Sequence, residues 1–294
     1  MMRVVVTGAS GQLGTYLVDW LVAEGHDTVA WSRSTRGERG GQPLVPVDLT
    51  DAVLTERALA EADPDVIVHA AAMSAAEQVR DNPTQAQAIN VEGTRRLADW
   101  CGRRSRRLVY TSTDLVFDGT KSWYREDDPA EPILAYGRTK RAAEPYVLAI
   151  PPGLVARVSL LYGPSRCGRE SFFSRTLAAI RAGKPQFLFD DEFRTPLDLA
   201  TAALLLERLS ISDHEGIIHV GGTERVSRFE LMSRAAAALG LDASLVRANH
   251  RCDVALPEPR PADVSLDTTR LASLLPDLLR PTIEEAVRSS SRAV

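Results

Sequence analysis

Short apolar runs alternate with stretches of helical periodicity along the first half of the chain. The apolar runs, rich in β-branched residues, are Arg3–Val6, Thr28–Trp31, Val66–His69, Leu108–Thr111 and Leu154–Val158. Between them, apolar residues recur at helical spacing in Leu13–Ala23, Val53–Ala62, Ala86–Trp100 and Tyr136–Leu148. Continuous apolar strands that alternate with helices are typical of a parallel sheet covered on both faces. Right-handed crossovers then build a doubly wound α/β sheet.

The rhythm becomes less regular after about Leu160. Gly216–Val220 still has the pattern of one more buried strand, and Phe229–Leu239 that of a helix following it. We therefore expect the chain to return to the first sheet after an excursion. The predicted division is a larger domain of residues 1–160 plus about 201–240, and a smaller, discontinuous C-terminal lobe of about 161–200 plus 241–294.

Composition narrows the class of protein. The 294 residues are 44% hydrophobic with a net charge of −4, which is too apolar for a disordered chain. With 35 Lys and Arg against 39 Asp and Glu, no positive field favours a nucleic-acid or anionic-membrane partner. The widely spaced Cys101, Cys167 and Cys252 fit a reducing compartment. No apolar run reaches the roughly 18 residues of a membrane span, and the N-terminus lacks a signal-peptide pattern. We expect a soluble, cytoplasmic protein.

Three glycines stand between the first strand and the first helix. Gly8 permits a tight turn, Gly11 lets backbone approach a pyrophosphate, and Gly14 lets the helix pack close to the sheet. The helix N-terminus itself attracts phosphates. The G-x-x-G-x-x-G spacing is one residue longer than the common dinucleotide fingerprint. We predict a dinucleotide-binding loop whose contacts come from Gly8, Ser10, Gly11, Gln12, Leu13 and Gly14.

The end of the second strand indicates which dinucleotide binds. It carries Ser32 and Arg33 and no acid, whereas an NAD site usually offers a carboxylate to the ribose 2′-hydroxyl. Ser32 can donate a hydrogen bond and Arg33 can bind a 2′-phosphate, so NADP(H) is preferred, with NAD(H) as the alternative. Arg33 could also be an ordinary surface arginine. Asp48 and Leu49 could contact the adenine, or Asp48 could cap the next helix.

Candidate chemistry appears on a later helix and on the strand before it. Tyr136 and Lys140 stand at i and i+4 and therefore project from one helix face. A close ammonium favours the ionised phenol and lowers its pKa toward the working range. Such a phenol can protonate a carbonyl oxygen as a hydride arrives at the carbon. Thr113 follows the strand Leu108–Thr111, where hydroxyls face the ligand crevice, although threonine is also common in strands.

Together these motifs resemble the extended short-chain dehydrogenase/reductase superfamily, and within it the dTDP-4-dehydrorhamnose reductase branch. The resemblance rests on the glycine loop, on Ser-Thr-Asp-Leu-Val-Phe-Asp-Gly at 112–119 and on Tyr-Gly-Arg-Thr-Lys at 136–140. Supporting matches are His69–Ala72, Ile89–Thr94, Phe193–Pro196 and Arg260–Asp267. The resemblance implies an NAD(P)-binding Rossmann domain, a substrate-binding lobe and a 4-keto-6-deoxy nucleotide sugar as substrate.

The resemblance also implies roles for single residues. Tyr136 would be the general acid, Lys140 would lower its pKa and hold the nicotinamide ribose, and Thr113 would bind the substrate carbonyl. Further cofactor contacts would come from Ala70, Ala71 and Ala72. Asp114 and Arg194 would bind substrate, with Arg194 facing the diphosphate or lying at the surface. Asn90 matches the family's helix asparagine or is a buried polar spacer.

Departures from the family pattern leave the sugar open. Leu115 stands where these reductases typically have Tyr, and His69, which we interpret as a packed histidine rather than a base, stands where they have Asn. One alternative function is a nucleotide-sugar epimerase with retained NAD, which Arg33 argues against. Another is a non-catalytic, NADP-binding regulatory subunit like the β subunit of methionine adenosyltransferase. Nothing in the sequence requires a metal, and a homodimer is conceivable.

Overall fold

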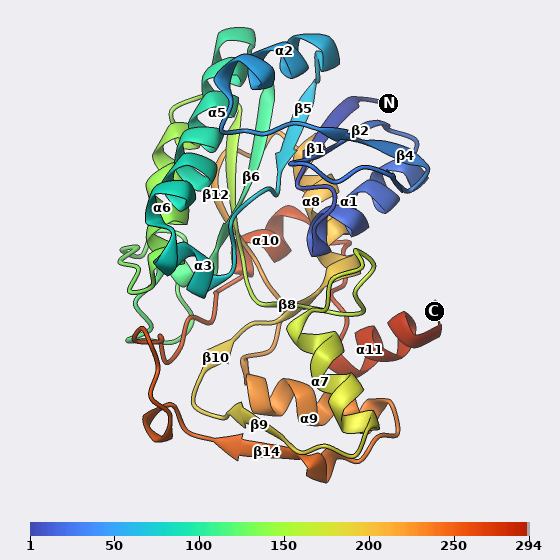
Figure 1. Ribbon diagram of the computed structural model, residues 1–294, viewed down its shortest axis with the longest axis vertical. Helices are drawn as coiled ribbons and strands as arrows, with labels where there is room; N and C mark the ends of the chain where they lie inside the picture. Colours follow the sequence, from blue (N-terminus) through green and yellow to red (C-terminus); the bar gives the residue numbers. More distant parts are fainter. Residues whose placement is uncertain (293–294) are drawn as a thin grey trace.

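An eight-stranded sheet forms the centre of the larger layer of the molecule (Figure 1). This computed structural model describes residues 1–292, and side chains through residue 290. In spatial order the strands are β12 (Gly216–Val220), β7 (Gly153–Val158), β6 (Arg107–Thr113), β5 (Val66–His69), β1 (Arg3–Thr7), β2 (Asp27–Ser32), β4 (Gln42–Pro46) and β3 (Glu38–Arg39). All neighbouring pairs are parallel except β3 and β4. The predicted doubly wound α/β sheet is confirmed.

Helices cover both faces of this sheet because its central strands are apolar on both sides. In β1, Val4 and Val6 pack in one hydrophobic cluster, whereas Val5 packs in another on the opposite face. The first face carries α1 (Gln12–Ala23) and α8 (Leu199–Ile211). The second carries α2 (Ala52–Ala62), α5 (Gly93–Arg104) and α6 (Ala135–Leu148) (Figure 1).

The predicted helix Ala86–Trp100 lies within one unbroken helical run whose type changes along its length. After α3 (Ala76–Asp81), the chain forms α4 (Pro83–Ala86), then a π-helical stretch at Gln87–Glu92, and only then α5. Such stretches are rare and often mark functional sites. Asn90 lies inside this one, and its place in the site is described below.

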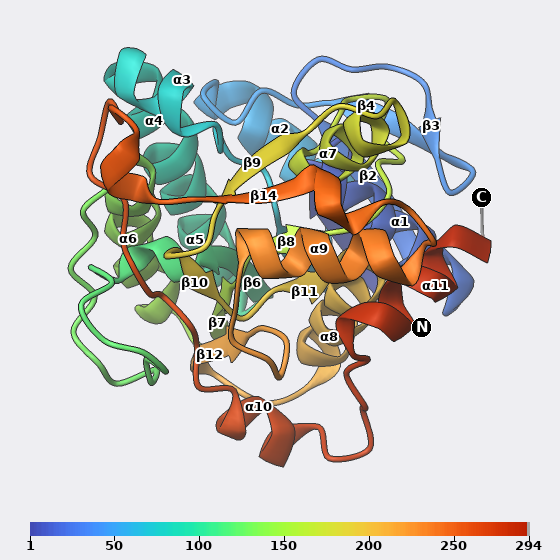
Figure 2. The ribbon, with the colours of Figure 1, turned by 90° about the horizontal axis from the view of Figure 1, so that it is seen from below.

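A smaller lobe lies below the sheet and has a hydrophobic cluster of its own (Figures 1 and 2). Its regular elements are α7 (Phe172–Arg181), α9 (Arg228–Ala238), α11 (Ile283–Arg292) and the parallel pair β9 (Gln186–Phe189) and β14 (Val246–Asn249). Seen from below, α9 and β14 lie across the lobe (Figure 2). Leu177, Leu231 and Ile283 join α7, α9 and α11 in this cluster.

Short elements complete the fold. They are β8 (Leu161–Tyr162) paired with β11 (Leu197–Asp198), β10 (Phe193–Arg194) paired with β13 (Val226–Ser227), α10 (Thr269–Leu274), and the 3₁₀ turns Asp114–Val116, Ala243–Leu245 and Arg251–Asp253. Within residues 1–292, no helix combines the length and the apolar character that a membrane crossing needs.

Packing differs from the predicted domain boundaries at two helices. The prediction assigned α9 to the larger domain, yet Leu231 and Ala235 pack in the cluster of the smaller lobe. It assigned α10 to the smaller lobe, yet Leu271 packs in the first sheet cluster. The reason is spatial, because α10 lies against the edge strand β12 whereas α9 packs on α7 and α11.

Candidate active site

Close backbone packing explains two glycines of the loop between β1 and α1. Gly8 has φ +71°, and a Cβ there would lie 2.8 Å from the Ala71 Cα atom. A Cβ on Gly14 would lie 2.1 Å from the Gly8 carbonyl oxygen. Gly14 therefore makes room for the loop itself, not for the sheet as the sequence suggested. The Gly11 N–H donates to the Gly8 carbonyl at 2.8 Å, which closes the turn.

The N-terminus of α1 is free to bind an anion. Its N-cap residue is Gly11, no side chain caps the helix, and its first turn holds no acidic residue. The first backbone N–H groups of any helix lack intrahelical partners, and the helix dipole adds positive potential there. The loop and this helix end therefore fit the diphosphate of a dinucleotide.

Six of the predicted cofactor residues line one pocket at the carboxyl ends of β1 and β2. They are Gly8, Ser32, Arg33, Asp48, Leu49 and Ala71. The side chain of Arg33 is exposed, and across the described part of the chain it forms no ion pair. An exposed guanidinium that lines this pocket suits a 2′-phosphate.

Asp48 does not cap the helix that follows, so that alternative is wrong. Its carboxylate accepts hydrogen bonds from the backbone N–H of Thr50 at 2.9 Å and from the Thr50 hydroxyl at 2.8 Å. Asp51 caps α2 instead, by accepting from the Leu54 N–H. Sequence alone could not separate two aspartates three residues apart, since both precede the helix.

Tyr136 and Lys140 lie in the first turns of α6, and neither side chain is hydrogen-bonded within the described residues. The Tyr136 side chain is half-buried, and no residue up to 292 donates to or accepts from its hydroxyl. Lys140 is 1% exposed, and its Nζ lies 4.2 Å from the centroid of the Tyr110 ring. The site thus holds a phenol and a buried cation that retain their full hydrogen-bonding capacity.

The pKa of Tyr136 moves in the direction opposite to the sequence-based prediction. Burial, and then the Asp114 carboxylate, raise the pKa of this phenol above its usual value. Burial lowers the pKa of Lys140 to about 7, although the carboxylate of Glu144 opposes this shift. Loss of solvation raises the pKa of Tyr136, and this outweighs the lowering that was expected from the Lys140 ammonium. Tyr136 therefore stays protonated at neutral pH, as a proton donor must.

Thr113, Asp114 and Arg194 form a buried polar chain where β6 ends. The Thr113 hydroxyl donates to Asp114 Oδ1 at 3.2 Å and accepts from the Leu115 N–H at 3.2 Å. Asp114 Oδ1 also accepts from the Arg194 guanidinium at 2.7 Å. Arg194 is only 4% exposed, so it is not a surface arginine. Substrate binding by these residues stays a prediction.

His69 belongs to a closed hydrogen-bond network. The Thr7 hydroxyl accepts from the Ala71 N–H and therefore donates to His69 Nδ1 at 2.6 Å. The Thr94 hydroxyl donates to the Asn90 carbonyl and therefore accepts from His69 Nε2 at 3.0 Å. Burial lowers the pKa of His69 to about 3, with Lys140 adding to the shift, so the ring is neutral. His69 therefore helps to position the surrounding backbone and does not act as a base.

Asn90 ties the segment after β5 to the helix that carries Tyr136. Its side chain accepts from the Met73 N–H at 2.8 Å and donates to the Met73 carbonyl at 3.0 Å. It also donates to the Thr139 hydroxyl at 2.9 Å, which in turn donates to the Tyr136 carbonyl. This clamp follows directly on Ala70–Ala72 and fixes their position relative to α6.

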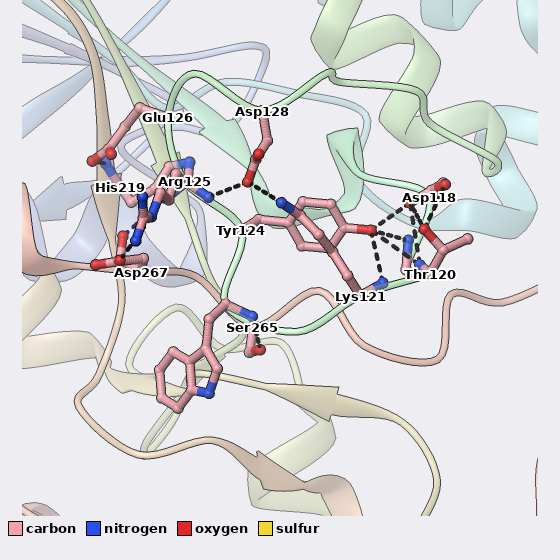
Figure 3. Close-up of polar contacts among 12 residues, drawn as sticks. Asp118, Thr120, Lys121, Tyr124, Arg125, Glu126, Asp128, His219, Ser265 and Asp267 are labelled. Carbon is pink, nitrogen blue, oxygen red and sulfur yellow. Dashed lines mark hydrogen bonds and ion pairs between the residues drawn. The ribbon is translucent and has the colours of Figure 1, made fainter.

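A second cluster, which sequence reasoning did not single out, braces the loop between β6 and α6 (Figure 3). The Tyr124 hydroxyl accepts from the backbone N–H groups of Gly119, Thr120 and Lys121 and donates to Asp118. The Trp123 N–H donates to the Ser265 hydroxyl at 2.8 Å, so the loop is joined to the C-terminal segment. The Asp-Gly end of the 112–119 motif is therefore structural. The match of residues 112–119 to the family motif was the signal from which this cluster could have been found.

Comparisons with known proteins agree with this geometry. The family model described as RmlD substrate binding domain matches residues 2–291. A dTDP-4-dehydrorhamnose reductase from Streptomyces griseus is 34% identical, over 91% of this chain and 86% of the relative. Methionine adenosyltransferase 2 subunit beta from Bos taurus is 30% identical, over 92% and 82%.

A solved structure extends the agreement to the whole fold. The crystal structure of dTDP-4-dehydrorhamnose reductase from Bacillus anthracis str. Ames in complex with NADP superposes with a TM-score of 0.87. It is 25% identical, and the match covers 100% of this chain and 99% of that one. Because the family model spans almost the entire sequence, the chain belongs to the RmlD substrate binding domain family, a branch of the extended short-chain dehydrogenases/reductases.

Proposed function

We propose that the protein is an NADP(H)-dependent oxidoreductase that reduces the carbonyl of a 4-keto-6-deoxy nucleotide sugar. The observation that carries the proposal is the half-buried Tyr136 phenol, protonated and without a hydrogen-bond partner among residues 1–292, one helical turn from the buried Lys140. Relatives named dTDP-4-dehydrorhamnose reductase, one of them in complex with NADP, support the substrate class and the cofactor.

The chemistry divides between cofactor and chain. When bound, the nicotinamide supplies the hydride. Tyr136 donates its phenolic proton to the carbonyl oxygen. Thr113 orients that oxygen by a hydrogen bond, for which its hydroxyl proton turns from Asp114 Oδ1 to the substrate. Lys140 holds the nicotinamide ribose. Its positive charge also favours the ionised phenol that remains after Tyr136 has given up its proton. Because its pKa is raised, Tyr136 enters the reaction protonated.

The two layers divide the binding. The sheet layer holds the dinucleotide through the free N–H groups of α1 and through Arg33 at the 2′-phosphate, with Ala70–Ala72 close to the cofactor. The smaller lobe and Arg194 receive the nucleotide sugar. The proposal includes a cytoplasmic location, where the free Cys101, Cys167 and Cys252 stay reduced, and a homodimer stays a prediction.

A direct assay tests the proposal. The purified protein is incubated with NADPH and a panel of 4-keto-6-deoxy nucleotide sugars, and cofactor oxidation is followed by absorbance. We expect turnover with at least one sugar, faster with NADPH than with NADH. Failure of every carbonyl substrate in the panel, with intact NADPH binding, would contradict a reductase.

Neither alternative is favoured over the reductase. The epimerase alternative needs tightly retained NAD, whereas Arg33 lies at the pocket mouth where a carboxylate would be needed. The regulatory-subunit alternative has a specific observation behind it, the 30% identity to methionine adenosyltransferase 2 subunit beta. A regulatory subunit would bind NADP(H) without sugar-dependent oxidation, so the same assay separates the two.

A further inference from the structure

A segment of the smaller lobe lies directly on the glycine loop. It comprises residues 164–169, between β8 and α7. The Arg169 guanidinium donates to the Ser10 carbonyl at 3.0 Å. In return, the Gln12 side-chain amide donates to the Arg169 carbonyl at 2.7 Å and to the Ser165 hydroxyl at 3.0 Å. The Tyr16 hydroxyl adds a bond to the Pro164 carbonyl at 2.9 Å.

The position of the Arg169 side chain is unusual for an exposed arginine. One of its terminal nitrogens lies 4.0 Å from the point where a Cβ on Gly11 would sit. Gly11 is the N-cap of α1, the helix end without a side-chain cap. A guanidinium and an uncapped helix N-terminus are both positive, and neither stabilises the other. The hydrogen bond to the Ser10 carbonyl holds the guanidinium there, and an anion between it and the helix end would make this approach more favourable.

Charge pairing separates Arg169 from its neighbour Arg166. Arg166 pairs with Asp19 at 3.5 Å and stacks over the Tyr16 ring, 4.4 Å from its centroid. Arg169 forms no ion pair with any residue that the structure describes, and its hydrogen bond to Ser10 uses one of five N–H donors. Two exposed arginines of one segment therefore differ, since one is neutralised by the protein and the other is not.

We propose that Arg169 is a further cofactor-binding residue, which binds the diphosphate of the dinucleotide from the side facing the smaller lobe. The free N–H groups of α1 and the guanidinium then contact the same anion, and the ligand removes the repulsion between them. This inference rests on the proposed function only in requiring a dinucleotide at the glycine loop. It also explains how the substrate lobe is held against the cofactor domain.

A purely structural role makes a different prediction. If Arg169 only braces the loop, its hydrogen bond to Ser10 matters and its charge does not. Arg169→Gln keeps a side-chain donor while removing the charge, and Arg169→Lys keeps the charge. Arg166→Gln is the matched control, because it removes a neighbouring charge that the protein already neutralises.

The test measures dissociation constants by calorimetry for NADPH, NADH and adenosine 2′-monophosphate, which has no diphosphate. We expect Arg169→Gln to weaken NADPH and NADH equally, by about tenfold, as expected for one lost hydrogen bond to a charged group. Arg169→Lys should recover part of the loss. Adenosine 2′-monophosphate should bind as to wild type, and Arg166→Gln should bind all three ligands normally. Added salt should weaken wild type more than Arg169→Gln.

Other outcomes separate the inference from the proposed function. Unchanged dinucleotide affinity in Arg169→Gln would leave only the bracing role. Equal loss for adenosine 2′-monophosphate would indicate a general distortion of the site. If wild type binds both dinucleotides but reduces no sugar, the proposed reductase fails while the inference stands. If wild type binds neither dinucleotide, both fail.

Discussion

Two tyrosines near the same strand end show how this protein separates support from chemistry. Tyr124 is buried, and its hydroxyl accepts three backbone N–H bonds and donates to Asp118. Tyr136 is half-buried, and its hydroxyl has no partner among the described residues. A hydroxyl has one proton and two lone pairs to offer, and the three N–H groups share the lone pairs of Tyr124. The Tyr124 hydroxyl uses all of its hydrogen bonds to fix a loop, whereas the Tyr136 hydroxyl keeps its hydrogen bonds for a substrate.

Two buried cations repeat the contrast. Arg157 donates to both carboxylate oxygens of Glu144, at 3.0 and 2.8 Å, and Ser112 adds a bond to the same carboxylate. Lys140, on the same helix as Glu144, has no side-chain hydrogen bond or ion pair within the described residues, and its Nζ lies over the face of Tyr110. Burial lowers the pKa of Lys140 to about 7 as a result. Burial of the Lys140 ammonium therefore lowers the stability of the fold at the place where the chemistry is expected.

The largest predicted effect is on the rate of the Tyr136→Phe variant. Loss of the proton donor should lower kcat/KM by roughly 10²–10⁴-fold. The free energy of unfolding in urea should change by less than about 0.5 kcal/mol, since no hydrogen bond is lost. NADPH affinity should survive. A near-wild-type rate would remove Tyr136 from the mechanism, and a large stability loss would end the comparison with Tyr124.

Lys140→Met should stabilise the protein in a pH-dependent manner. The pKa of Lys140 falls from 10.5 to about 7 on folding, so between these values the unfolded chain binds more protons than the folded one. The penalty is complete below pH 7 and is lost as the pH rises toward 10.5. The variant should gain up to about 5 kcal/mol below pH 7, at 1.36 kcal/mol per unit. Urea unfolding across this range measures the gain.

Lys184 supplies the control for that series, because its side chain is exposed. Lys184→Met should change the free energy of unfolding little and equally at every pH. A gain that does not shrink between pH 7 and 10.5 in Lys140→Met would show that the buried charge is not its source.

Tyr124→Phe should reverse the pattern of Tyr136→Phe. It leaves three backbone N–H groups and the Asp118 carboxylate without their shared partner, which should cost about 2–4 kcal/mol in the free energy of unfolding. The rate of the folded variant should fall far less than that of Tyr136→Phe. Tyr146→Phe, at an exposed tyrosine, is the matched control and should be neutral. A neutral Tyr124→Phe would refute the bracing role.

The smallest predicted effect is at Arg33. Arg33→Ala should weaken NADPH by about tenfold through loss of one charge-assisted contact, and NADH hardly at all. Binding titrations with both dinucleotides measure this selectivity. Because Arg169→Gln should weaken both equally, the two variants divide the cofactor site into a 2′-phosphate end and a diphosphate end. Equal losses in Arg33→Ala would undo its assignment.

Local patterns in the sequence carried much of the fold and part of the site. The apolar runs located β1, β2, β5, β6, β7 and β12, since both faces of a parallel sheet are buried, and the glycine spacing located the loop before α1. The Asp114–Arg194 pair could not be foreseen, because its members stand 80 positions apart and only the fold brings them together. The same limit applies to Arg169 and to the direction of the Tyr136 pKa, which burial decides.

The most direct test of the proton-donor role replaces Tyr136 by 3,5-difluorotyrosine, whose phenol is more acidic. Single-turnover rates of hydride transfer from pre-bound NADPH to the keto sugar are measured against pH, with the same replacement at Tyr124 as control. We predict that the modified Tyr136 raises the rate at neutral pH, because a more acidic phenol donates its proton more readily, and that the modified Tyr124 leaves the rate unchanged. An unchanged profile with the modified Tyr136 would contradict the claim that its hydroxyl donates the proton.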